Sequence, residues 1–316
     1  MHILLTGGCG YIGSILTPKL LNAGFKVTVI DIMWFGNFLS DHKNLKIIQH
    51  DIRNINNLTM EDVDVVIHLA NIANDPCGDL DPKLSWEVNA LATMSLIEWA
   101  IRHNTKQFIY ASSGSVYGVK EEPQVTEELS LVPISDYNKT KMISERVLLS
   151  YKDSVVLQCI RPATVCGYSP RMRLDVSVNM LTTQALVNHK ITVFGGEQVR
   201  PNIHIQDITD LVLFFIEKGE KVQGIYNAGF ENISIMDIAK KATELAPAEI
   251  VVTPSNDPRS YRLNSDKLLA TGFKPKYNVE YAIKEIVASF EAGKLPNPMD
   301  DKRYYNIKTM QVQKTK

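Results

Sequence analysis

Short apolar runs alternate with stretches of helical periodicity along the first half of the chain, and this alternation predicts a parallel sheet. The expected strands cover residues 3–6, 25–30, 45–49, part of 62–70, 107–111 and 155–160. The expected helices cover residues 14–23, 86–103 and 136–151, and Leu91, Met94, Leu96 and Ile97 form the apolar face of the second. Right-handed crossovers then give an α/β, doubly wound sheet with ligands at the carboxyl ends of its strands.

The second half predicts a smaller lobe. Helical patterns cover residues 176–188, 208–218, 234–245 and 281–293, and a short strand covers 191–194. Residues 224–229 have the pattern of a strand that returns to the first sheet. We therefore expect a first domain over 1–165, with later returns near 203–229, and a smaller α/β lobe mainly over 166–316 that closes over a cleft. The polar tail beyond Pro296 is expected to be partly unattached to the core.

Composition narrows the class of protein. The 316 residues carry a net charge of −1, so no global basic field attracts nucleic acid or an anionic membrane. No apolar run is long enough to span a bilayer. Because the first strand is predicted directly after Met1 and His2, we expect no secretory signal. The four cysteines lack metal-ligand spacing, and Cys9 and Cys159 fall in or beside core elements. We expect a cytoplasmic protein without a metal site.

Glycines at positions 7, 10 and 13 join the first strand to the first helix. In such a turn Gly7 takes a conformation that a Cβ resists, Gly10 admits phosphates to the main chain, and Gly13 lets the helix pack closely. The helix N-terminus then faces the pyrophosphate of a dinucleotide. Asp31 follows the second strand, 18 residues after Gly13, where a carboxylate accepts hydrogen bonds from the adenosine ribose and repels a 2′-phosphate. This pattern favours NAD over NADP.

A tyrosine and a lysine four residues apart form the candidate catalytic pair. Tyr137 and Lys141 share one face of the helix over 136–151. A nearby ammonium favours phenolate, so we expect the pKa of Tyr137 to fall from about 10 toward operating pH. The pair could then remove a proton from a sugar or alcohol hydroxyl while hydride leaves the same carbon. The serine-rich segment 112–118, after the fifth strand, offers a hydroxyl to hold the substrate oxygen.

These motifs together resemble the NAD-dependent nucleotide-sugar epimerase/dehydratase family, which belongs to the extended short-chain dehydrogenases/reductases. The resemblance rests on the fingerprint over 6–13, Asp31, Asp51-Ile52, His68-Leu69-Ala70, Asn89, 112–118, Tyr137 with Lys141, and Arg161-Pro162, and it extends to about residue 290. It implies a Rossmann-type fold, bound NAD, and Ser113, Tyr137 and Lys141 as the catalytic residues. The cofactor residues it implies are Gly7, Gly10, Tyr11, Ile12, Gly13, Asp31, Ile32, Asp51, Ile52, Leu69, Ala70, Asn89, Tyr137, Lys141 and Pro162. Of these, it implies that Asp51 and Ile52 flank the adenine, that Leu69, Ala70 and Asn89 line the cofactor groove, and that Lys141 also binds the nicotinamide ribose.

The resemblance also implies a nucleotide-diphosphate sugar as substrate. Arg200 and Arg259 match the arginines that bind the substrate diphosphate, and guanidinium forks suit phosphate oxygens. The other expected substrate residues are Ser113, Ser115, Thr164 and Asn179, and Arg171 or Arg173 could supply a further anionic contact. We expect His68, His204 and Asp207 to be structural rather than catalytic.

The reaction is the part that the resemblance leaves open. Relatives that act as 4,6-dehydratases carry an acidic residue directly after the catalytic Ser or Thr, because elimination needs an acid and a base. Gly114 and Ser115 occupy these positions, which argues against a dehydratase. A 4-epimerase remains the first interpretation, and a 4-dehydrogenase that releases a 4-keto hexose or heptose the alternative. The sugar and the nucleotide base stay open.

Two further alternatives are weaker. Asp31 argues against a keto-sugar reductase, which usually prefers NADPH. A non-catalytic NAD(H) sensor would have lost Ser113, Tyr137 or Lys141, and all three are present. The resemblance also implies a homodimer, or a tetramer built from dimers, in which the helices over 86–103 and 136–151 pair.

Overall fold

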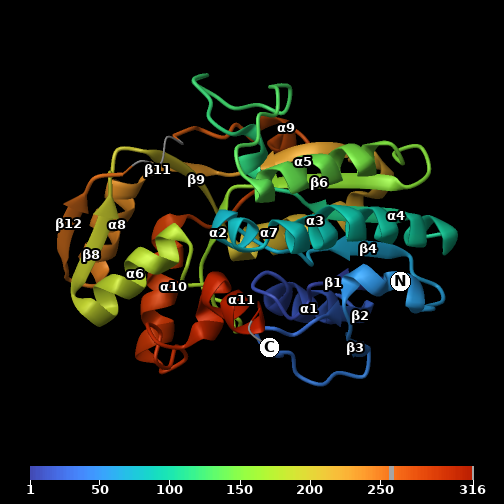
Figure 1. Cartoon of the computed structure of the whole chain (residues 1–316), viewed down its shortest axis with the longest axis horizontal. Coiled ribbons are helices and arrows are strands. Elements are labelled where there is room, and N and C mark those ends of the chain that lie inside the picture. The colour runs from blue at the N-terminus through green and yellow to red at the C-terminus, as the bar shows by residue number, and fades with distance from the viewer. Residues whose placement is uncertain (256–259, 315–316) are drawn as a thin grey trace.

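A parallel sheet forms the centre of the protein, for which a computed structural model describes residues 1–255 and 260–314 (Figure 1). Its seven strands are ordered β10-β6-β5-β4-β1-β2-β3, and every neighbouring pair is parallel. The strands are β1 His2–Thr6, β2 Lys26–Asp31, β3 Leu45–Gln49, β4 Val65–His68, β5 Gln107–Ala111, β6 Val156–Pro162 and β10 Gly224–Ala228. The predicted Rossmann-type doubly wound fold is confirmed, including the strand that returns over 224–228.

Helices cover both faces of this sheet, which explains why its strands are apolar on both sides. α1 Gly13–Asn22 and α7 Ile205–Lys218 lie on one face, where Leu5 belongs to the core. The 3₁₀ segment η1 Ile52–Asn57, α4 Ala92–Arg102 and α5 Asp136–Leu149 lie on the other, where Leu4 belongs to the core. All strands run the same way, so their carboxyl ends meet at one edge.

The helix expected over 86–103 is three segments: α3 Pro82–Trp86, a π-helical turn η2 Glu87–Leu91, and α4. Leu96 and Ile97 are buried as predicted, but 56% of Leu91 and 38% of Met94 are exposed. The predicted apolar face was too wide: at about 100° per residue Leu91 points away from both Leu96 and Ile97, and Met94 lies about 60° from Ile97 but about 160° from Leu96, at the margin of the face.

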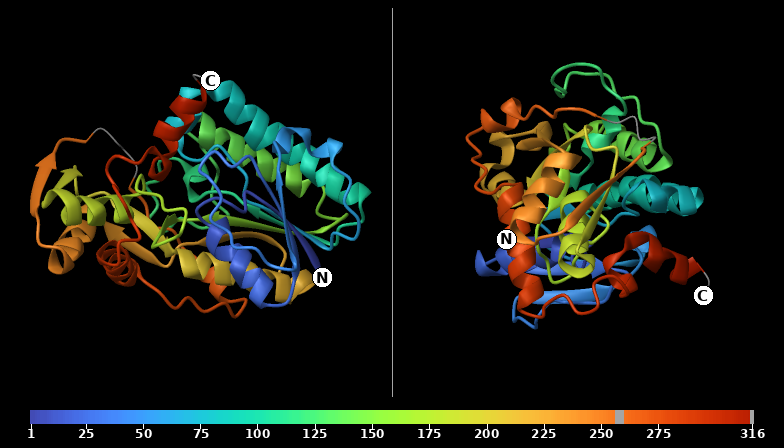
Figure 2. Two further views of the ribbon diagram at one scale, coloured as in Figure 1. Left: turned by 90° about the horizontal axis from the view of Figure 1, so that it is seen from below. Right: turned by 90° about the vertical axis from the view of Figure 1, so that its left-hand side faces the viewer.

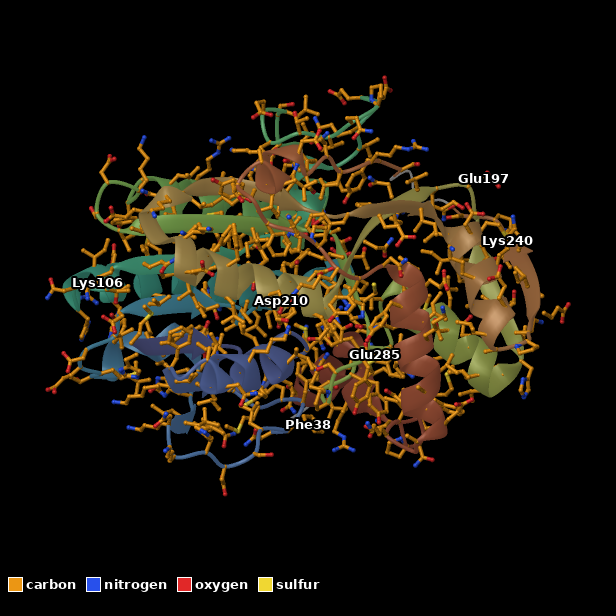
Figure 3. All side chains as sticks on the ribbon, turned by 180° about the vertical axis from the view of Figure 1, so that it is seen from behind. Phe38, Lys106, Glu197, Asp210, Lys240 and Glu285 are labelled. Atoms are coloured by element: carbon orange, nitrogen blue, oxygen red, sulfur yellow. The ribbon has the colours of Figure 1, made fainter. Side chains whose placement is uncertain are left out.

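The second lobe has its own core of helices and short strands. α6 Ser177–Asn188, α8 Ile235–Leu245 and α10 Val279–Glu291 pack beside the parallel pair β8 Lys190–Phe194 and β12 Glu249–Thr253. A three-stranded sheet, β11-β9-β7, consists of Glu231–Ser234, Val199–His204 and Thr164–Cys166. In Figure 3, Glu197 and Lys240 mark the end of this lobe, whereas Lys106 marks the opposite end of the molecule.

The C-terminal tail is docked, so the prediction that it is partly unattached was wrong. The 3₁₀ turn η5 Lys302–Tyr304 and the helix α11 Asn306–Lys314 follow α10, and α11 packs on α2 Asp75–Leu80 (Figure 2). Met310 is 3% exposed in a small apolar cluster with Ile72 and Cys77. A few anchoring side chains suffice to hold a polar segment, and average composition does not reveal them. Among the described helices, none has the length and apolar character needed to cross a membrane.

Candidate active site

The glycine-rich turn after β1 lies tightly against the neighbouring strand end. Gly7 has φ +74°, and a Cβ there would stand 2.6 Å from the backbone nitrogen of Ala70. A Cβ at Gly13 would stand 2.4 Å from the Gly7 carbonyl oxygen. Gly10 has only that carbonyl near its added Cβ, at 3.1 Å. The turn therefore brings bare backbone to the start of α1, whose first N–H groups have no partner within the helix. This is the cradle that a dinucleotide diphosphate requires.

Asp31 stands at the end of β2 beside this turn. One of its carboxylate oxygens accepts the Cys9 N–H at 2.9 Å and the other accepts the Met33 N–H at 2.7 Å. Burial raises the carboxyl pKa, and these two N–H groups oppose the rise. Ile32 follows with 37% of its surface exposed. Each oxygen keeps a lone pair for a ribose hydroxyl, so the residue fits its predicted role.

Asp51 and Ile52 stand after β3 at the same edge of the sheet. Asp51 caps η1 through the Arg53 N–H at 2.9 Å and pairs with the Arg53 guanidinium at 2.7 Å. Ile52 is 5% exposed in the core. The position agrees with the expected adenine site, although the Asp51 carboxylate is already engaged by its neighbour.

Three other predicted cofactor residues lie around β4. The Leu69 and Ala70 backbones form the wall behind Gly7, and their N–H groups bond the Thr6 carbonyl and hydroxyl. Asn89 is different, because it is 1% exposed and its amide bonds both backbone groups of Ile72. It also donates to the Thr140 hydroxyl. Asn89 therefore fixes the segment after β4 against α5, and its contact with the cofactor stays a prediction.

Tyr137 stands in the first turn of α5, opposite the end of β5. Ser113, at the start of the 3₁₀ turn η3 Gly114–Tyr117, hydrogen-bonds the Tyr137 side chain. Burial nevertheless raises the Tyr137 pKa to about 12, against the lowering effects of Ser113 and Arg173. The expectation of a pKa below 10 was wrong for the protein alone, because desolvation of the phenolate outweighs the nearby donors.

Ser113 belongs to a short chain of hydroxyls. Its Oγ lies 2.7 Å from Ser115 Oγ, and Ser115 donates to Asn138 Oδ1 at 2.5 Å. Asn138 is buried and directly follows Tyr137. Sequence reasoning named Ser113 and Ser115 but missed Asn138, although its place in the helix put it on the side of these serines.

Lys141 is 3% exposed and lies one turn below Tyr137. Its ammonium donates to the Ala111 carbonyl at 2.7 Å and lies 4.7 Å from the centre of the Tyr110 ring. Burial lowers its pKa from 10.5 to about 7, and the Glu145 carboxylate opposes that fall. The helix thus places an ammonium group that is destabilised by burial at the end of β5. The nicotinamide ribose is expected in the same region.

A buried ion pair supports this end of the sheet. Glu145, 1% exposed, binds Arg161 Nη2 at 2.6 Å and also accepts the hydroxyl of Ser112. Arg161 donates to Tyr117 Oη at 2.7 Å. Together they lock the segment that carries Ser113 to α5. Sequence reasoning missed Glu145, because nothing in its spacing shows that it meets Arg161.

Two of the predicted substrate residues, Thr164 and Arg200, lie on the three-stranded sheet. Thr164 pairs with Asn202, and Arg200 stands two residues before Asn202 on β9, so all three share a face. Pro162 ends β6 beside this sheet, and its carbonyl lies 3.2 Å from the Cβ position of Gly114. Arg259 lies outside the described residues.

Asn179 connects the second lobe to the glycine-rich turn, and its predicted substrate contact stays a prediction. It is fully buried, accepts the Gly167 N–H at 3.0 Å, and donates to Tyr11 Oη at 3.0 Å and to the Arg173 carbonyl at 2.8 Å. Both amide protons are used, so the residue joins the second lobe to the glycine-rich turn. Tyr11, predicted at the cofactor, reaches across to the same segment and donates to the Gly167 carbonyl at 2.6 Å.

The residues expected to be structural have such positions. His68 is buried between the hydroxyls of Thr6 and Thr93, at 2.7 and 2.9 Å, and burial lowers its pKa to about 3. His204 caps α7, and Asp207 accepts two backbone N–H groups. In Figure 3, Glu285 extends from α10 toward the centre of the molecule, where it accepts the Tyr168 N–H at 2.7 Å.

Comparison with known proteins places this geometry in a family. A model of the NAD dependent epimerase/dehydratase family matches residues 3–229. The UDP-glucose 4-epimerase of Lactobacillus helveticus is 27% identical over 90% of this chain and 95% of its own. The uncharacterized UDP-glucose epimerase YtcB of Bacillus subtilis is 32% identical over 81% of this chain and 88% of its own.

Solved structures agree in fold. The UDP-glucose 4-epimerase of Thermotoga maritima with UDP-glucose superposes with a TM-score of 0.82 at 26% identity, covering 93% of this chain and 99% of that one. The Thermus thermophilus UDP-glucose 4-epimerase complex with NAD gives a TM-score of 0.81 at 26% identity, over 92% and 99%. An NDP-hexosamine 5,6-dehydratase of tunicamycin biosynthesis gives 0.82 at 22%, over 92% and 98%, which shows that the fold alone does not distinguish the reactions.

Proposed function

Because this chain belongs to the NAD-dependent epimerase/dehydratase family and uses NAD, we propose that it interconverts the C4 epimers of a nucleotide-diphosphate sugar. UDP-linked hexoses are the first candidates, since the relatives reported above are named for UDP-glucose. The glycine-rich turn, the Asp31 carboxylate and Lys141 would hold the dinucleotide, and NAD supplies a hydride acceptor when bound. The protein's own side chains then need only to hold the sugar and to transfer one proton.

Tyr137 and Ser113 are the groups that we assign to that proton. Their side chains are hydrogen-bonded to each other at the carboxyl end of β5. In the proposed cycle Ser113 holds O4, and Tyr137, as the phenolate, takes the O4 proton while the C4 hydride leaves. The phenolate requires the Tyr137 pKa to fall below its value of about 12 in the protein alone, which a positive charge beside the ring favours. The keto sugar then turns and recovers the hydride on its other face while Tyr137 returns the proton. The cycle leaves the redox state of the protein unchanged.

The observation that carries the choice of reaction is the pair of residues after Ser113. Gly114 has no side chain, and the Ser115 hydroxyl donates its proton to Asn138 at 2.5 Å. Asp75 is a carboxylate that raises the Tyr137 pKa, but it accepts the hydroxyl of Ser135 at 2.6 Å. Elimination of water needs an acid and a base beside the sugar, and this arrangement offers neither at the positions after Ser113. Epimerisation requires no further group.

Incubation of the purified protein with UDP-glucose, UDP-galactose and other nucleotide-linked sugars, followed by NMR of the product, tests the proposal. We expect a C4 epimer of unchanged mass without accumulation of NADH. A 4-keto sugar with stoichiometric NADH would make the enzyme a dehydrogenase, and loss of water would make it a dehydratase.

Two variants connect the reaction to the assigned residues. Tyr137→Phe and Ser113→Ala should each lower kcat by about 10²–10⁴-fold, because each removes a group that acts on the transferred proton. Tyr151→Phe is the matched control, since Tyr151 follows the same helix and contacts Glu98 at 3.3 Å. Equal activity of Tyr137→Phe and Tyr151→Phe would refute the assignment.

We also propose a homodimer formed through α4 and α5. Leu91, Met94 and Ile143 are exposed apolar residues on these neighbouring segments, with 56%, 38% and 37% of their surfaces accessible. Pairing with a second copy would bury them in a bundle of four helices. Light scattering should give a dimer for the wild type and a monomer for Leu91→Glu/Ile143→Glu, whereas a wild-type monomer would refute this assembly.

A further inference from the structure

A segment of the second lobe lies across the glycine-rich turn. The Ser169 hydroxyl donates to the Tyr11 carbonyl at 2.8 Å, and Tyr11 Oη donates to the Gly167 carbonyl at 2.6 Å. The backbone then continues through Arg171 and Arg173. The segment that carries these two arginines is therefore fastened to Tyr11, two residues before α1 begins.

Arg171 is a buried cation that lacks a counter-ion. It is 3% exposed, and its guanidinium lies 3.6 Å from the centre of the Phe35 ring. Nη2 donates to Asn306 Oδ1 at 2.5 Å, but Nε has no hydrogen-bond partner among the described residues. Burial, followed by the charge of Arg173, lowers the Arg171 pKa from 12.5 to about 9. An unpaired buried donor of this kind indicates a missing anion.

Neither nearby carboxylate acts as the counter-ion of Arg171. Asp175 binds Arg173 Nε at 2.9 Å and also accepts the Asn306 N–H at 3.0 Å. Asp31 accepts two backbone N–H groups and is expected at the adenosine ribose. Both carboxylates raise the Arg171 pKa from a distance, but neither forms a hydrogen bond to it. The charge of Arg173 is balanced, whereas that of Arg171 is not.

The neighbours of the two arginines identify the missing anion. Asp31 is among the charges that act on Arg171, and Arg173 is among those that act on Tyr137. The arginines therefore stand between the adenosine end and the nicotinamide end of the expected dinucleotide, where its diphosphate lies. We propose that Arg171 binds the diphosphate of NAD from the second lobe, opposite the glycine-rich turn, with its guanidinium oriented by Asn306. The planar fork of arginine suits this ligand.

The C-terminal helix takes part in this contact. Asn306 begins α11, and the backbone carbonyl of Tyr304 accepts the Leu174 N–H at 2.9 Å. The tail is therefore attached to the segment that carries Arg171 and Arg173. α11 also packs on α2, whose Gly78 lies against the Tyr137 backbone (Figure 2). An Arg171 held in place by the tail would add to the binding of the dinucleotide and slow its release. Slow release suits an enzyme that returns its hydride within each turnover, so this consequence rests on the proposed function.

Binding of dinucleotide fragments to protein freed of NAD tests the proposal without turnover. Arg171→Met should weaken ADP-ribose about 10–100-fold in calorimetry, the loss expected for a charged hydrogen-bonded contact, and leave adenosine within about twofold. Dissociation of NADH, followed by its fluorescence, should accelerate about tenfold or more. Arg303→Met is the matched control, because Arg303 is exposed on the same tail and pairs with Asp301 at 2.7 Å.

Two further variants keep the test decisive. Arg171→Lys retains the charge without the fork and should fall between wild type and Arg171→Met, and Asn306→Leu should weaken ADP-ribose through the loss of orientation. These variants decide the matter if Arg171→Met does not fold. Equal losses for ADP-ribose and adenosine, or a loss for UDP in place of ADP-ribose, would overturn the proposal. Because fragment binding needs no sugar, a failure to epimerise would leave this test unaffected.

Discussion

Lys141 should destabilise the protein in the absence of cofactor, and its removal should make the fold more stable. A pKa that falls from 10.5 to about 7 corresponds to about 5 kcal/mol of unfavourable free energy for the charged amine in the folded state. Lys141→Met keeps the length of the side chain and removes the charge. It also leaves the Ala111 carbonyl without its donor, at a cost of about 1–3 kcal/mol. The net gain at pH 6 is about 2–4 kcal/mol.

The sign of the pH dependence follows from proton counts. Below pH 7 the amine is protonated in both folded and unfolded chains, so the full penalty is present. Between pH 7 and 10.5 the unfolded chain binds more protons, so the stability contributed by this group rises with pH by up to about 1.4 kcal/mol per unit. Above pH 10.5 both states are neutral and the penalty is gone. The advantage of Lys141→Met should therefore shrink steadily as the pH is raised.

Urea unfolding of NAD-free protein at pH 6, 8 and 10, followed by tryptophan fluorescence, measures this effect. Lys139→Met is the control, because Lys139 is exposed on the same helix, and its stability should stay within about 0.5 kcal/mol of wild type. A Lys141→Met variant less stable than wild type at pH 6, or a difference that does not change with pH, would refute the reasoning. Turnover should be lost in the variant in either case.

Three other substitutions probe the ion pair, the ribose carboxylate and the tail. Glu145→Gln should destabilise the protein by about 3–5 kcal/mol in urea unfolding, because it leaves the buried Arg161 without its counter-ion. Asp31→Asn should shift the ratio of NADPH to NADH dissociation constants by about tenfold or more toward NADPH, because a repelling charge is removed; fluorescence titration measures both. Met310→Asp should lower the free energy of unfolding by about 2–4 kcal/mol and expose the tail to proteases, since it buries an unpaired charge.

Each of these has a refuting outcome, and the Glu145 and Met310 variants also have a matched control. Glu291 is exposed at the end of α10, so Glu291→Gln should leave the free energy of unfolding unchanged. Equal stability of the two glutamine variants would show that the buried ion pair does not stabilise the protein. An unchanged NADPH preference in Asp31→Asn would show that this carboxylate does not face the ribose. Lys302→Asp, exposed on the tail, should leave protease resistance intact, and equal cleavage of wild type and Met310→Asp would mean that α11 is not docked.

The sequence was most informative where function and backbone geometry coincide. Gly7 is required by its positive φ and by the close approach of Ala70, and Gly13 by the Gly7 carbonyl, so the glycine spacing predicted the cradle. The inner strands of the central sheet are buried on both faces and stand out as short apolar runs, whereas the edge strand β3 is partly exposed. Tyr137 and Lys141 could be paired because an α-helix fixes which residues share a face.

Residues that depend on distant partners could not be placed in this way. Asn89 and Asn179 occupy expected positions in the chain, yet their amides bond to Ile72 and Gly167 and fix loops. The Tyr137 pKa depends on burial, which no spacing reveals. Asn306 meets Arg171 across 135 positions of the chain, in a tail whose polarity suggested a loose segment.

The fate of a deuterium at C4 tests the central claim most directly. UDP-glucose labelled with deuterium at C4 would be converted by the enzyme with its bound NAD, and the product examined by NMR and mass spectrometry. The account predicts a C4-inverted sugar that keeps its deuterium at C4, because the same hydride equivalent is returned within one turnover. Deuterium found in free reduced cofactor, together with a 4-keto sugar, would contradict it.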